Sequence, residues 1–354
     1  MRIALLGVGT IGRELIRRTS GNPMFSYVAL GDRSGVIAID STFTDEGLGE
    51  LVRLKEAGGR LKDHDGDHEY YKSMKAALVS CSVDALVDAT DAQTHGLLHK
   101  ALEHAHVVTS NKIPIADVPY SRFRGLVSKA RDEGRILDFG TTVGAGMRFP
   151  DMIRSMGSDG IERVAGCLSG TMNYVSQRIN EGRPLSMALK EAMEPPRQYT
   201  EPDPRVDLGG EDFARKLVII GRMCGRSIDL DTVEIEELVP EPLKKLPVEE
   251  FLEALTDLDP GIRSRIERAN SEGKKIWYLG TADLREDVYS IGFEDVPVGD
   301  PITSAKESDN VLKLYPSRWR RMVTISGPGA GPPETVTGVI YGLRTVANNL
   351  RTEL

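Results

Sequence analysis

The pattern Gly7-Val-Gly-Thr-Ile-Gly12 constrains the fold of this 354-residue chain more than any other feature. It follows the apolar run Ile3 to Leu6, which predicts a strand, and it opens the amphipathic segment Ile11 to Arg18, which predicts a helix. In such a turn the first glycine permits a tight bend, the second lets a pyrophosphate approach the backbone, and the third lets helix and strand pack closely. The helix N-terminus then faces the phosphates. The pattern predicts a dinucleotide-binding βαβ unit; the alternative is a strand-helix turn that merely requires glycine.

Apolar and amphipathic segments continue to alternate up to residue 140, which is typical of repeated βαβ units. Further strands are predicted at Tyr27 to Leu30, Ala85 to Ala89, Val107 to Thr109 and Ile136 to Phe139, with helices at Gln93 to His104 and Tyr120 to Asp132. We therefore expect an α/β fold whose N-terminal Rossmann domain, residues 1–140, is built on a doubly wound parallel sheet.

The sequence changes character after residue 140. The glycine-rich segment Thr142 to Met147 leads into mixed strands, paired helices and loops, which predicts a second, α+β domain over residues 141–320. Residues 321–354 return to an apolar strand at Met322 to Ile325, a Gly/Pro turn and a helix from Glu334 to Leu350. We expect this last helix to pack on the first domain.

Four further residues near the ends of the predicted parallel strands suit a dinucleotide. Asp32 ends the second strand and could accept hydrogen bonds from the ribose hydroxyls of NAD, whereas the adjacent Arg33 could pair with the 2′-phosphate of NADP, so both cofactors stay open. Thr90 and Lys112 follow two other strands and are expected near the nicotinamide. Lys112 could equally be a solvated surface cation.

Composition excludes several classes of protein. The net charge is −8, the richest basic cluster is only Arg318, Arg320 and Arg321, and no stretch approaches 18 consecutive apolar residues. We expect neither a nucleic-acid nor a membrane partner. The three cysteines are far apart in the sequence and form no CxxC pair, which argues against a disulfide framework and favours a reducing, cytoplasmic location.

Two histidine pairs could suggest a metal site. His64 and His68 lie in an acid-rich turn, and His95 and His99 are spaced i,i+4 on a predicted helix without the glutamate of an HExxH motif. We interpret the first pair as a solvated loop and the second as a partly buried helix face.

The densest group of polar residues runs from Tyr199 to Lys216. Two prolines stiffen the segment that holds Glu201 and Asp203, and on the following helix Asp212 and Lys216 share a face at i,i+4. One interpretation is a surface ion pair that contributes about 0.3–0.5 kcal/mol. The other is a substrate site, in which carboxylates receive an ammonium group and a lysine donates a proton to a carbonyl oxygen.

The motifs together resemble the homoserine dehydrogenase family in its short, monofunctional form. They follow the family's order along the whole chain and comprise Gly7 to Gly12, Ser110-Asn-Lys112, Thr142-Val-Gly-Ala-Gly146, Leu168 to Tyr174, Tyr199 to Lys216, and Ser326-Gly-Pro-Gly-Ala-Gly331. The acids, prolines and lysine between Glu201 and Lys216 are the most specific part. With 354 residues we expect no fused aspartate kinase and no full regulatory domain.

The resemblance implies NAD(P)-dependent, reversible reduction of L-aspartate 4-semialdehyde to L-homoserine, a step towards threonine, methionine and isoleucine. It implies a homodimer formed through the second domain, which also binds substrate and carries out catalysis. Lys216 would donate the proton and Lys112 would bridge cofactor and substrate. The implied substrate residues are Glu201, Asp212, Asp207, Thr171, Gly170 and Tyr199, and the implied cofactor residues are Gly7, Gly9, Thr10, Ile11, Gly12, Asp32, Arg33, Thr90, Lys112 and Gly331. A lysine is ordinarily protonated at neutral pH, so homoserine oxidation should be favoured at high pH.

The sequence departs from the family pattern at three positions. Gly140 replaces a common acid, Arg148 replaces a proline after the glycine-rich turn, and Ser169 replaces an asparagine. The resemblance also implies a monovalent cation, Na⁺ or K⁺, bound by the backbone carbonyls of Gly140, Val143, Ala145 and Met147.

Two other functions remain open at this stage. One is another NAD(P)-dependent amino-acid or sugar dehydrogenase of the same architecture. The other is an inactive nucleotide-sensing regulator, which would be expected to lack the acids and lysines that this sequence retains.

Overall fold

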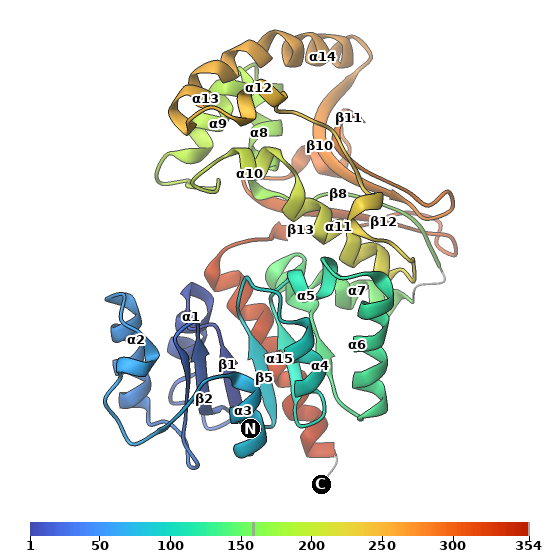
Figure 1. Ribbon diagram of the computed structural model, residues 1–354. Helices are drawn as coiled ribbons and strands as arrows, with labels where there is room; N and C mark the ends of the chain where they lie inside the picture. The colour runs from blue at the N-terminus through green and yellow to red at the C-terminus, as the bar shows by residue number, and fades with distance from the viewer. Residues whose placement is uncertain (158–159, 353–354) are drawn as a thin grey trace. The chain divides into compact units, whose positions relative to one another are not determined.

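Buried apolar strands in the N-terminal part of the chain form a seven-stranded sheet in the order β4-β3-β2-β1-β5-β6-β7. Figure 1 labels three of these strands, β1, β2 and β5. Five of its strands are parallel: β1 (Arg2–Leu6), β2 (Ser26–Asp32), β5 (Ala85–Asp88), β6 (His106–Thr109) and β7 (Leu137–Asp138). Because β1 pairs with both β2 and β5, the order of the strands reverses at β1. The carboxyl ends of the strands at such a reversal form the ligand crevice of open α/β sheets.

Two antiparallel strands at one edge of this sheet were not predicted. They are β3 (Gly35–Ala38) and β4 (Glu69–Tyr71). Gly35 has φ +137°, and a Cβ atom there would lie 2.2 Å from the Tyr70 hydroxyl oxygen. The glycine therefore allows the tight turn from β2 into β3 and the close packing of Tyr70. The sheet is parallel over five strands, as predicted, and mixed at this edge.

The structure, a computed structural model, describes residues 1–157 and 160–352, which divide into two compact units. Unit 1 comprises Met1–Pro150 and Gly331–Leu354, and unit 2 comprises Asp151–Ala330. The helices of unit 1 are α1 (Thr10–Thr19), α2 (Asp45–Glu56), α3 (Met74–Ser80), α4 (His95–Ala101), α5 (Ile113–Ala116), α6 (Tyr120–Asp132) and α15 (Pro332–Thr352), with short 3₁₀ turns at η1 (Leu61–Asp63), η2 (Gly140–Thr142) and η3 (Ala145–Met147).

The boundaries of unit 1 lie about ten residues beyond those expected from the sequence. The turns η2 and η3 contact α15. The contact is close at Gly338 of α15, where a Cβ atom would lie 2.4 Å from Thr141 Oγ1 and 2.7 Å from Ala145 O. Val336, Val339 and Leu343 of α15 join the core of the sheet, as expected for the C-terminal helix. The linking helix α7 (Phe149–Met156) then leads into unit 2.

Unit 2 is built on a six-stranded sheet in the order β13-β12-β8-β10-β11-β9. Its strands are β8 (Ile161–Cys167), β9 (Glu234–Ile235), β10 (Lys274–Asp283), β11 (Val288–Pro297), β12 (Asp309–Pro316) and β13 (Val323–Pro328). Its helices are α8 (Gly170–Asn180), α9 (Leu185–Met193), α10 (Arg205–Leu208), α11 (Glu211–Met223), α12 (Glu241–Lys244), α13 (Val248–Ala254) and α14 (Asp259–Ser271), with 3₁₀ turns at η5 (Leu230–Thr232), η6 (Leu255–Leu258) and η7 (Pro301–Ser304). The strand expected near Met322 is therefore β13 of unit 2.

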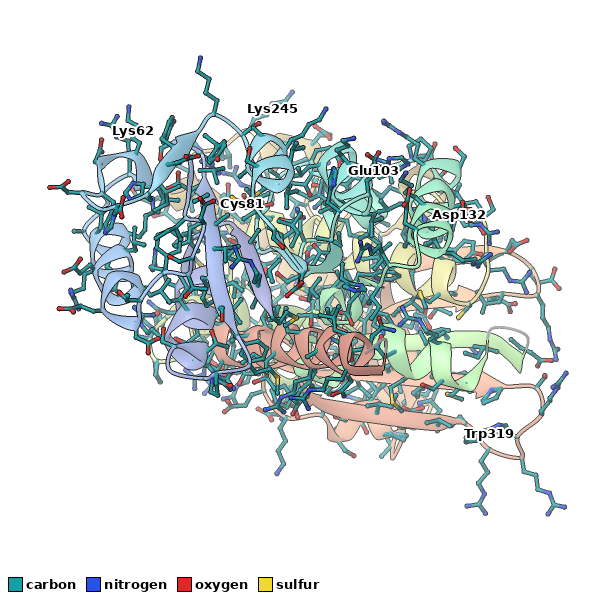
Figure 2. All side chains as sticks on the ribbon, turned by 90° about the horizontal axis from the view of Figure 1, so that it is seen from below. Lys62, Cys81, Glu103, Asp132, Lys245 and Trp319 are labelled. Atoms are coloured by element: carbon teal, nitrogen blue, oxygen red, sulfur yellow. The ribbon has the colours of Figure 1, made fainter. Side chains whose placement is uncertain are left out.

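The cysteines and the basic cluster differ in their exposure. All three cysteines are free and buried. The basic cluster lies in the loop between β12 and β13 beside Trp319, which is exposed (Figure 2). In the described part of the chain, no helix is long and apolar enough to cross a membrane.

Candidate active site

The glycine-rich turn after β1 has the geometry that a pyrophosphate requires. Gly7 has φ +97°, and a Cβ atom there would lie 2.6 Å from Ala89 O; at Gly12 it would lie 2.0 Å from Gly7 O. A Cβ atom at Gly9 would meet no atom within 4 Å, so the backbone is open on that side. Thr10 and Ile11 begin α1, and no side chain caps this helix. The first N–H groups of α1 therefore remain available to an anion.

Asp32, at the end of β2, is paired with a lysine that the sequence analysis missed. Lys55 of α2 approaches Asp32 Oδ2 at 2.6 Å, and Ser34 donates to Oδ1 through its N–H and its hydroxyl. Burial alone would raise the pKa of Asp32, but the hydrogen bonds from Lys55 and Ser34 lower it below its ordinary value. Arg33 is almost fully exposed and lies 3.7 Å from Asp91. The group at this position is thus a neutralised ion pair rather than an isolated acid.

A buried carboxylate organises the ends of β5 and β6. Asp88 accepts hydrogen bonds from Thr90, from Thr94 Oγ1 at 2.6 Å and from Asn111 Nδ2 at 3.2 Å. Burial raises the pKa of Asp88 above its ordinary value, and these hydrogen bonds offset only part of that rise. Asn111 Oδ1 in turn accepts from Ile113 N, which fixes the turn that contains Lys112. Thr90 and Lys112 are therefore held in one network, and Gly331, with φ +111°, immediately precedes α15 in the same unit.

In unit 2, Lys216 lies on α11 with its ammonium group held in place. Its Nζ atom donates to Leu168 O at 2.7 Å and lies 2.9 Å from Asp212 Oδ2, one helical turn earlier. The Lys216 side chain is 11% exposed and that of Asp212 is 50% exposed. An ammonium group has three N–H donors, so one remains for a substrate oxygen. Burial raises the pKa of the nearby Cys167 to about 12, which keeps this thiol neutral.

Three acidic residues are close enough to Lys216 or to one another to act together. Asp207 on α10 accepts hydrogen bonds from Thr171 Oγ1 at 2.8 Å and from Glu201 N at 2.9 Å. The pKa of Asp207 lies above its ordinary value, mainly because of burial and also because of the charges of Glu201 and Asp212. The two hydrogen bonds lower the pKa but offset only part of this rise. With Lys216, the group carries an excess of negative charge. Such a site favours a ligand with a cationic end.

Tyr199 lies next to this group, and its hydroxyl binds Glu307, a residue that was not predicted from the sequence. Its carbonyl oxygen lies 2.7 Å from Thr171 Oγ1, and its hydroxyl donates to Glu307 at 2.7 Å. Gly170 packs against the neighbour of Glu307, because a Cβ atom at Gly170 would lie 3.0 Å from Ser308 O. Ser169, one of the departures from the family pattern, accepts a hydrogen bond from Met172 N and caps α8. Serine in place of the family's asparagine therefore still caps the start of α8.

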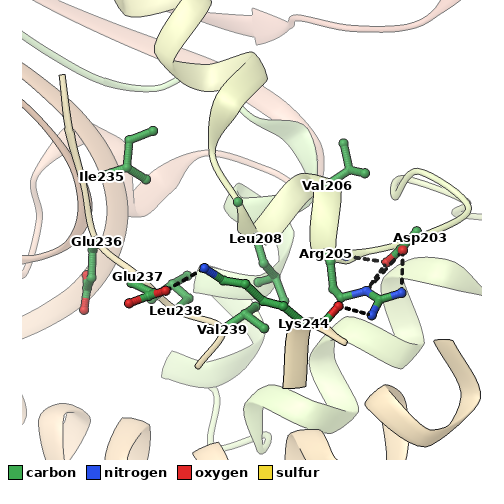
Figure 3. Close-up of a pocket in the computed structure, with 11 residues that line it drawn as sticks. Asp203, Arg205, Val206, Leu208, Ile235, Glu236, Glu237, Leu238, Val239 and Lys244 are labelled. Carbon is green, nitrogen blue, oxygen red and sulfur yellow. Dashed lines mark hydrogen bonds and ion pairs between the residues drawn. The ribbon is translucent and has the colours of Figure 1, made fainter. Parts of the chain in front are cut away.

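A cavity of about 710 Å³ lies beside α10 (Figure 3). Apolar residues of α10 and of the segment after β9 line it, together with the ion pair between Arg205 and Asp203. Arg205 also donates to the carbonyls of Lys244 and Leu246. Neither Asp207 nor Lys216 lines this cavity.

The predicted cation ligands and the histidine pairs belong to unit 1. Ala145 O and Val143 O accept hydrogen bonds from the backbone N–H groups of Arg148 and Phe149, respectively. Arg148 is buried at φ +53° and its guanidinium donates to Gly338 O at 2.6 Å and to Asp138 Oδ2 at 2.5 Å. Within residues 1–157 and 160–352, no three His, Cys, Asp or Glu side chains are grouped so as to hold a metal.

Known proteins share both the sequence and the fold of this chain. A family model described as homoserine dehydrogenase matches residues 151–343. The homoserine dehydrogenase of Saccharomyces cerevisiae is 33% identical over 215 residues, which cover 59% of this chain and 60% of that protein. The homoserine dehydrogenase of Schizosaccharomyces pombe is 26% identical over 99% of this chain and 96% of its own length. A solved structure from Archaeoglobus fulgidus, provisionally named homoserine dehydrogenase, is 27% identical, covers 98% of this chain and 99% of its own, and superposes with a TM-score of 0.76.

Proposed function

Because this chain belongs to the homoserine dehydrogenase family, we propose that it catalyses the reversible NAD(P)-dependent reduction of L-aspartate 4-semialdehyde to L-homoserine. The observation that carries the proposal is the group in unit 2, where Glu201, Asp207 and Asp212 accompany a single buried ammonium group on Lys216. The substrate presents the complementary groups: a cationic amino end and a carbonyl oxygen that must gain a proton.

Each residue in the group has a distinct role in this proposal. Asp207 and Glu201 bind the substrate ammonium group, and Thr171 holds Asp207 in place through its hydroxyl. Lys216 donates a proton to the carbonyl oxygen during reduction and accepts it during oxidation. Asp212 and Leu168 O orient the Lys216 ammonium group towards that oxygen. A bound nicotinamide cofactor supplies the hydride in reduction and receives it in oxidation.

The direct test is to follow NAD(P)H formation from L-homoserine at alkaline pH, with NAD and NADP assayed separately. L-aspartate and simple sugars are assayed separately as alternative substrates. Their turnover would indicate another dehydrogenase with the same architecture. Turnover of L-homoserine alone supports the proposal. No turnover of L-homoserine with either cofactor would overturn it, and would favour an inactive regulator.

The ion pair between Lys55 and Asp32 leads to a prediction about cofactor choice. In Lys55→Met we expect the ratio of kcat/KM for NADP to that for NAD to fall at least about tenfold, because a hydrogen bond to a charged group contributes about 1.5–3 kcal/mol. The change removes a cation that can bind the 2′-phosphate and frees Asp32 Oδ2 to accept from a ribose hydroxyl. Fluorescence titration with NADPH and NADH measures the same preference without turnover.

Lys62→Met is the matched control for this prediction. Lys62 is an exposed lysine in the same unit (Figure 2), and its removal changes the net charge by the same amount. An equal fall in the NADP preference of both variants would mean that overall charge, rather than Lys55, sets the preference.

We also propose that a monovalent cation can bind at the glycine-rich turn after residue 140. Val143 O and Ala145 O each accept one hydrogen bond and retain a second lone pair, so the backbone carbonyls at Gly140, Val143, Ala145 and Met147 can still act as ligands. The buried guanidinium of Arg148 already supplies positive charge next to this turn, which weakens the attraction for an ion. Thermal stability in KCl, NaCl and choline chloride at equal ionic strength tests the site, and identical curves would exclude a bound ion.

We further propose that the protein is a homodimer, as the family resemblance implies, and that it is cytoplasmic, as its cysteine usage favours. Light scattering coupled to size exclusion should give twice the mass of one chain. A single-chain mass at micromolar concentration would contradict the dimer without affecting the proposed reaction.

A further inference from the structure

Glu307 occupies a backbone conformation that side chains other than glycine rarely adopt. Its φ is +41°, in the left-handed region, and it lies in the loop between η7 and β12. This loop is held in place by two hydrogen bonds of the buried Asn173 side chain: Trp277 Nε1 donates to Asn173 Oδ1 at 2.9 Å, and Asn173 Nδ2 donates to Glu307 O at 2.9 Å. Unfavourable backbone conformations that the surroundings enforce in this way are concentrated at functional sites.

The Glu307 side chain controls the hydrogen bonding of Tyr199. A tyrosine hydroxyl has one proton to donate, and Tyr199 donates it to Glu307 Oε2 at 2.7 Å. Towards any other partner, the Tyr199 hydroxyl oxygen is therefore an acceptor: one lone pair accepts from the Ser308 hydroxyl, and the second is available to a ligand. The T-shaped contact between the rings of Tyr199 and Tyr174, with centroids 5.4 Å apart, restricts the direction in which that oxygen can point.

The main-chain carbonyl of Tyr199 and the nearby Asp207 carboxylate are also hydrogen-bond acceptors. The Tyr199 carbonyl oxygen lies 2.7 Å from the Thr171 hydroxyl, and Asp207 lies 2.8 Å from that hydroxyl on its other side. This end of the group around Lys216 thus presents oxygen acceptors. A substrate ammonium group offers three donors to such a surface, whereas a substrate carboxylate offers none.

We propose that Glu307 is a positioning residue for the amino end of the substrate: by accepting the only hydroxyl proton of Tyr199, it leaves that oxygen as an acceptor for the ammonium group. This inference rests on the proposed function. It also accounts for an acidic residue at a position where glycine would be less strained, since glycine would lack the acceptor.

The test compares Glu307→Gly with the wild type. Glycine suits φ +41° and therefore leaves the fold intact, but it removes the acceptor for Tyr199. We expect KM for L-homoserine to rise about 3–10-fold, as for the loss of one ordinary hydrogen bond, while KM for the cofactor stays within about twofold. The inhibition constant of 4-hydroxybutanoate, which lacks the amino group, should not change. Glu307→Gln retains an acceptor oxygen, so its KM should lie between those of Glu307→Gly and the wild type.

A double-mutant cycle shows whether Glu307 acts through Tyr199. In a Tyr199→Phe background, Glu307→Gly should cause no further rise in KM for L-homoserine. An additional rise of the same size would overturn the proposed role, because Glu307 would then act independently of Tyr199.

Asp287→Gly is the matched structural control. Asp287 also has a positive φ, +53°, and also accepts a hydrogen bond from a tyrosine hydroxyl, that of Tyr289 at 3.1 Å, but in the turn between β10 and β11. We expect its KM for L-homoserine to be unchanged and its melting temperature to match that of Glu307→Gly within about 2 °C. A wild-type KM in Glu307→Gly, or an equal rise in KM in Asp287→Gly, overturns the role of Glu307 alone. Absence of homoserine turnover in the wild type instead overturns the proposed function and this inference with it.

Discussion

Lys216→Met should lower kcat for L-homoserine oxidation by at least about 100-fold, which is the lower limit for loss of a general acid or base. The substitution retains the aliphatic stem on α11 and removes the ammonium group that bonds to Leu168 O and lies beside Asp212. The reaction then lacks the group that exchanges a proton with the substrate oxygen. Steady-state rates with saturating L-homoserine and cofactor measure the loss. A kcat within about threefold of the wild type would contradict the role of Lys216.

The neighbouring Arg215 provides the control for this substitution. It also lies on α11 and also forms an i,i+4 ion pair, with Glu211 at 2.6 Å, but no proton-transfer role is proposed for it. Arg215→Met should keep kcat within about twofold and lose at most about 0.5 kcal/mol of stability, as expected for an i,i+4 helix pair. A comparable loss of kcat in both variants would indicate damage to α11 rather than loss of a proton carrier.

The rate should also depend on pH in a direction set by the reaction. In oxidation, the group that accepts the substrate proton must first be unprotonated, so the wild-type rate should rise towards alkaline pH. In Lys216→Met, this rise should disappear together with the rate.

The sequence was most informative where one local pattern specifies both structure and packing. The range of α6, Tyr120–Asp132, was predicted without error, because its apolar spacing is regular and a proline precedes it. The turn from Gly7 to Gly12 was recognisable because glycine is required there by contacts within a few residues and with the adjacent strand. In contrast, β3 and β4 are only four and three residues long, too short for a periodic pattern to identify.

Residues brought together by long-range pairing could not be predicted. Glu307 reaches Tyr199 because β12 pairs antiparallel with β8, which places the loop before β12 next to the start of α8. No spacing between positions 199 and 307 records that pairing. Lys55 was missed for a similar reason, since its approach to Asp32 depends on how α2 packs beside β2. Asp88 was assigned to a buried strand, and the donors that justify burying its carboxylate became visible only in the structure.

Arg148→Met should lower the free energy of unfolding by about 3–5 kcal/mol, the usual cost of removing one partner of a buried ion pair. Arg148 is buried, donates to Asp138 on β7, and also donates to Gly338 O of α15. Its loss would remove the charge partner of a buried carboxylate and a contact that joins the glycine-rich turn to α15. Calorimetric unfolding of the full chain should show a clear decrease in the transition temperature of unit 1.

Two variants separate the buried charge from the contact with α15. Arg18→Met removes another arginine that donates to α15, at Pro333 O and Thr337 Oγ1, but in an exposed position, and should cost less than about 1 kcal/mol. The double variant Arg148→Met with Asp138→Asn contains no buried charge, so it should recover at least half of the stability lost in Arg148→Met. Failure to recover would mean that the hydrogen bond to Gly338 O, rather than the ion pair, accounts for the loss. Arg148 would then stabilise unit 1 as a link between the turn and α15, as the proline expected at this position could not, because proline has no side-chain donor.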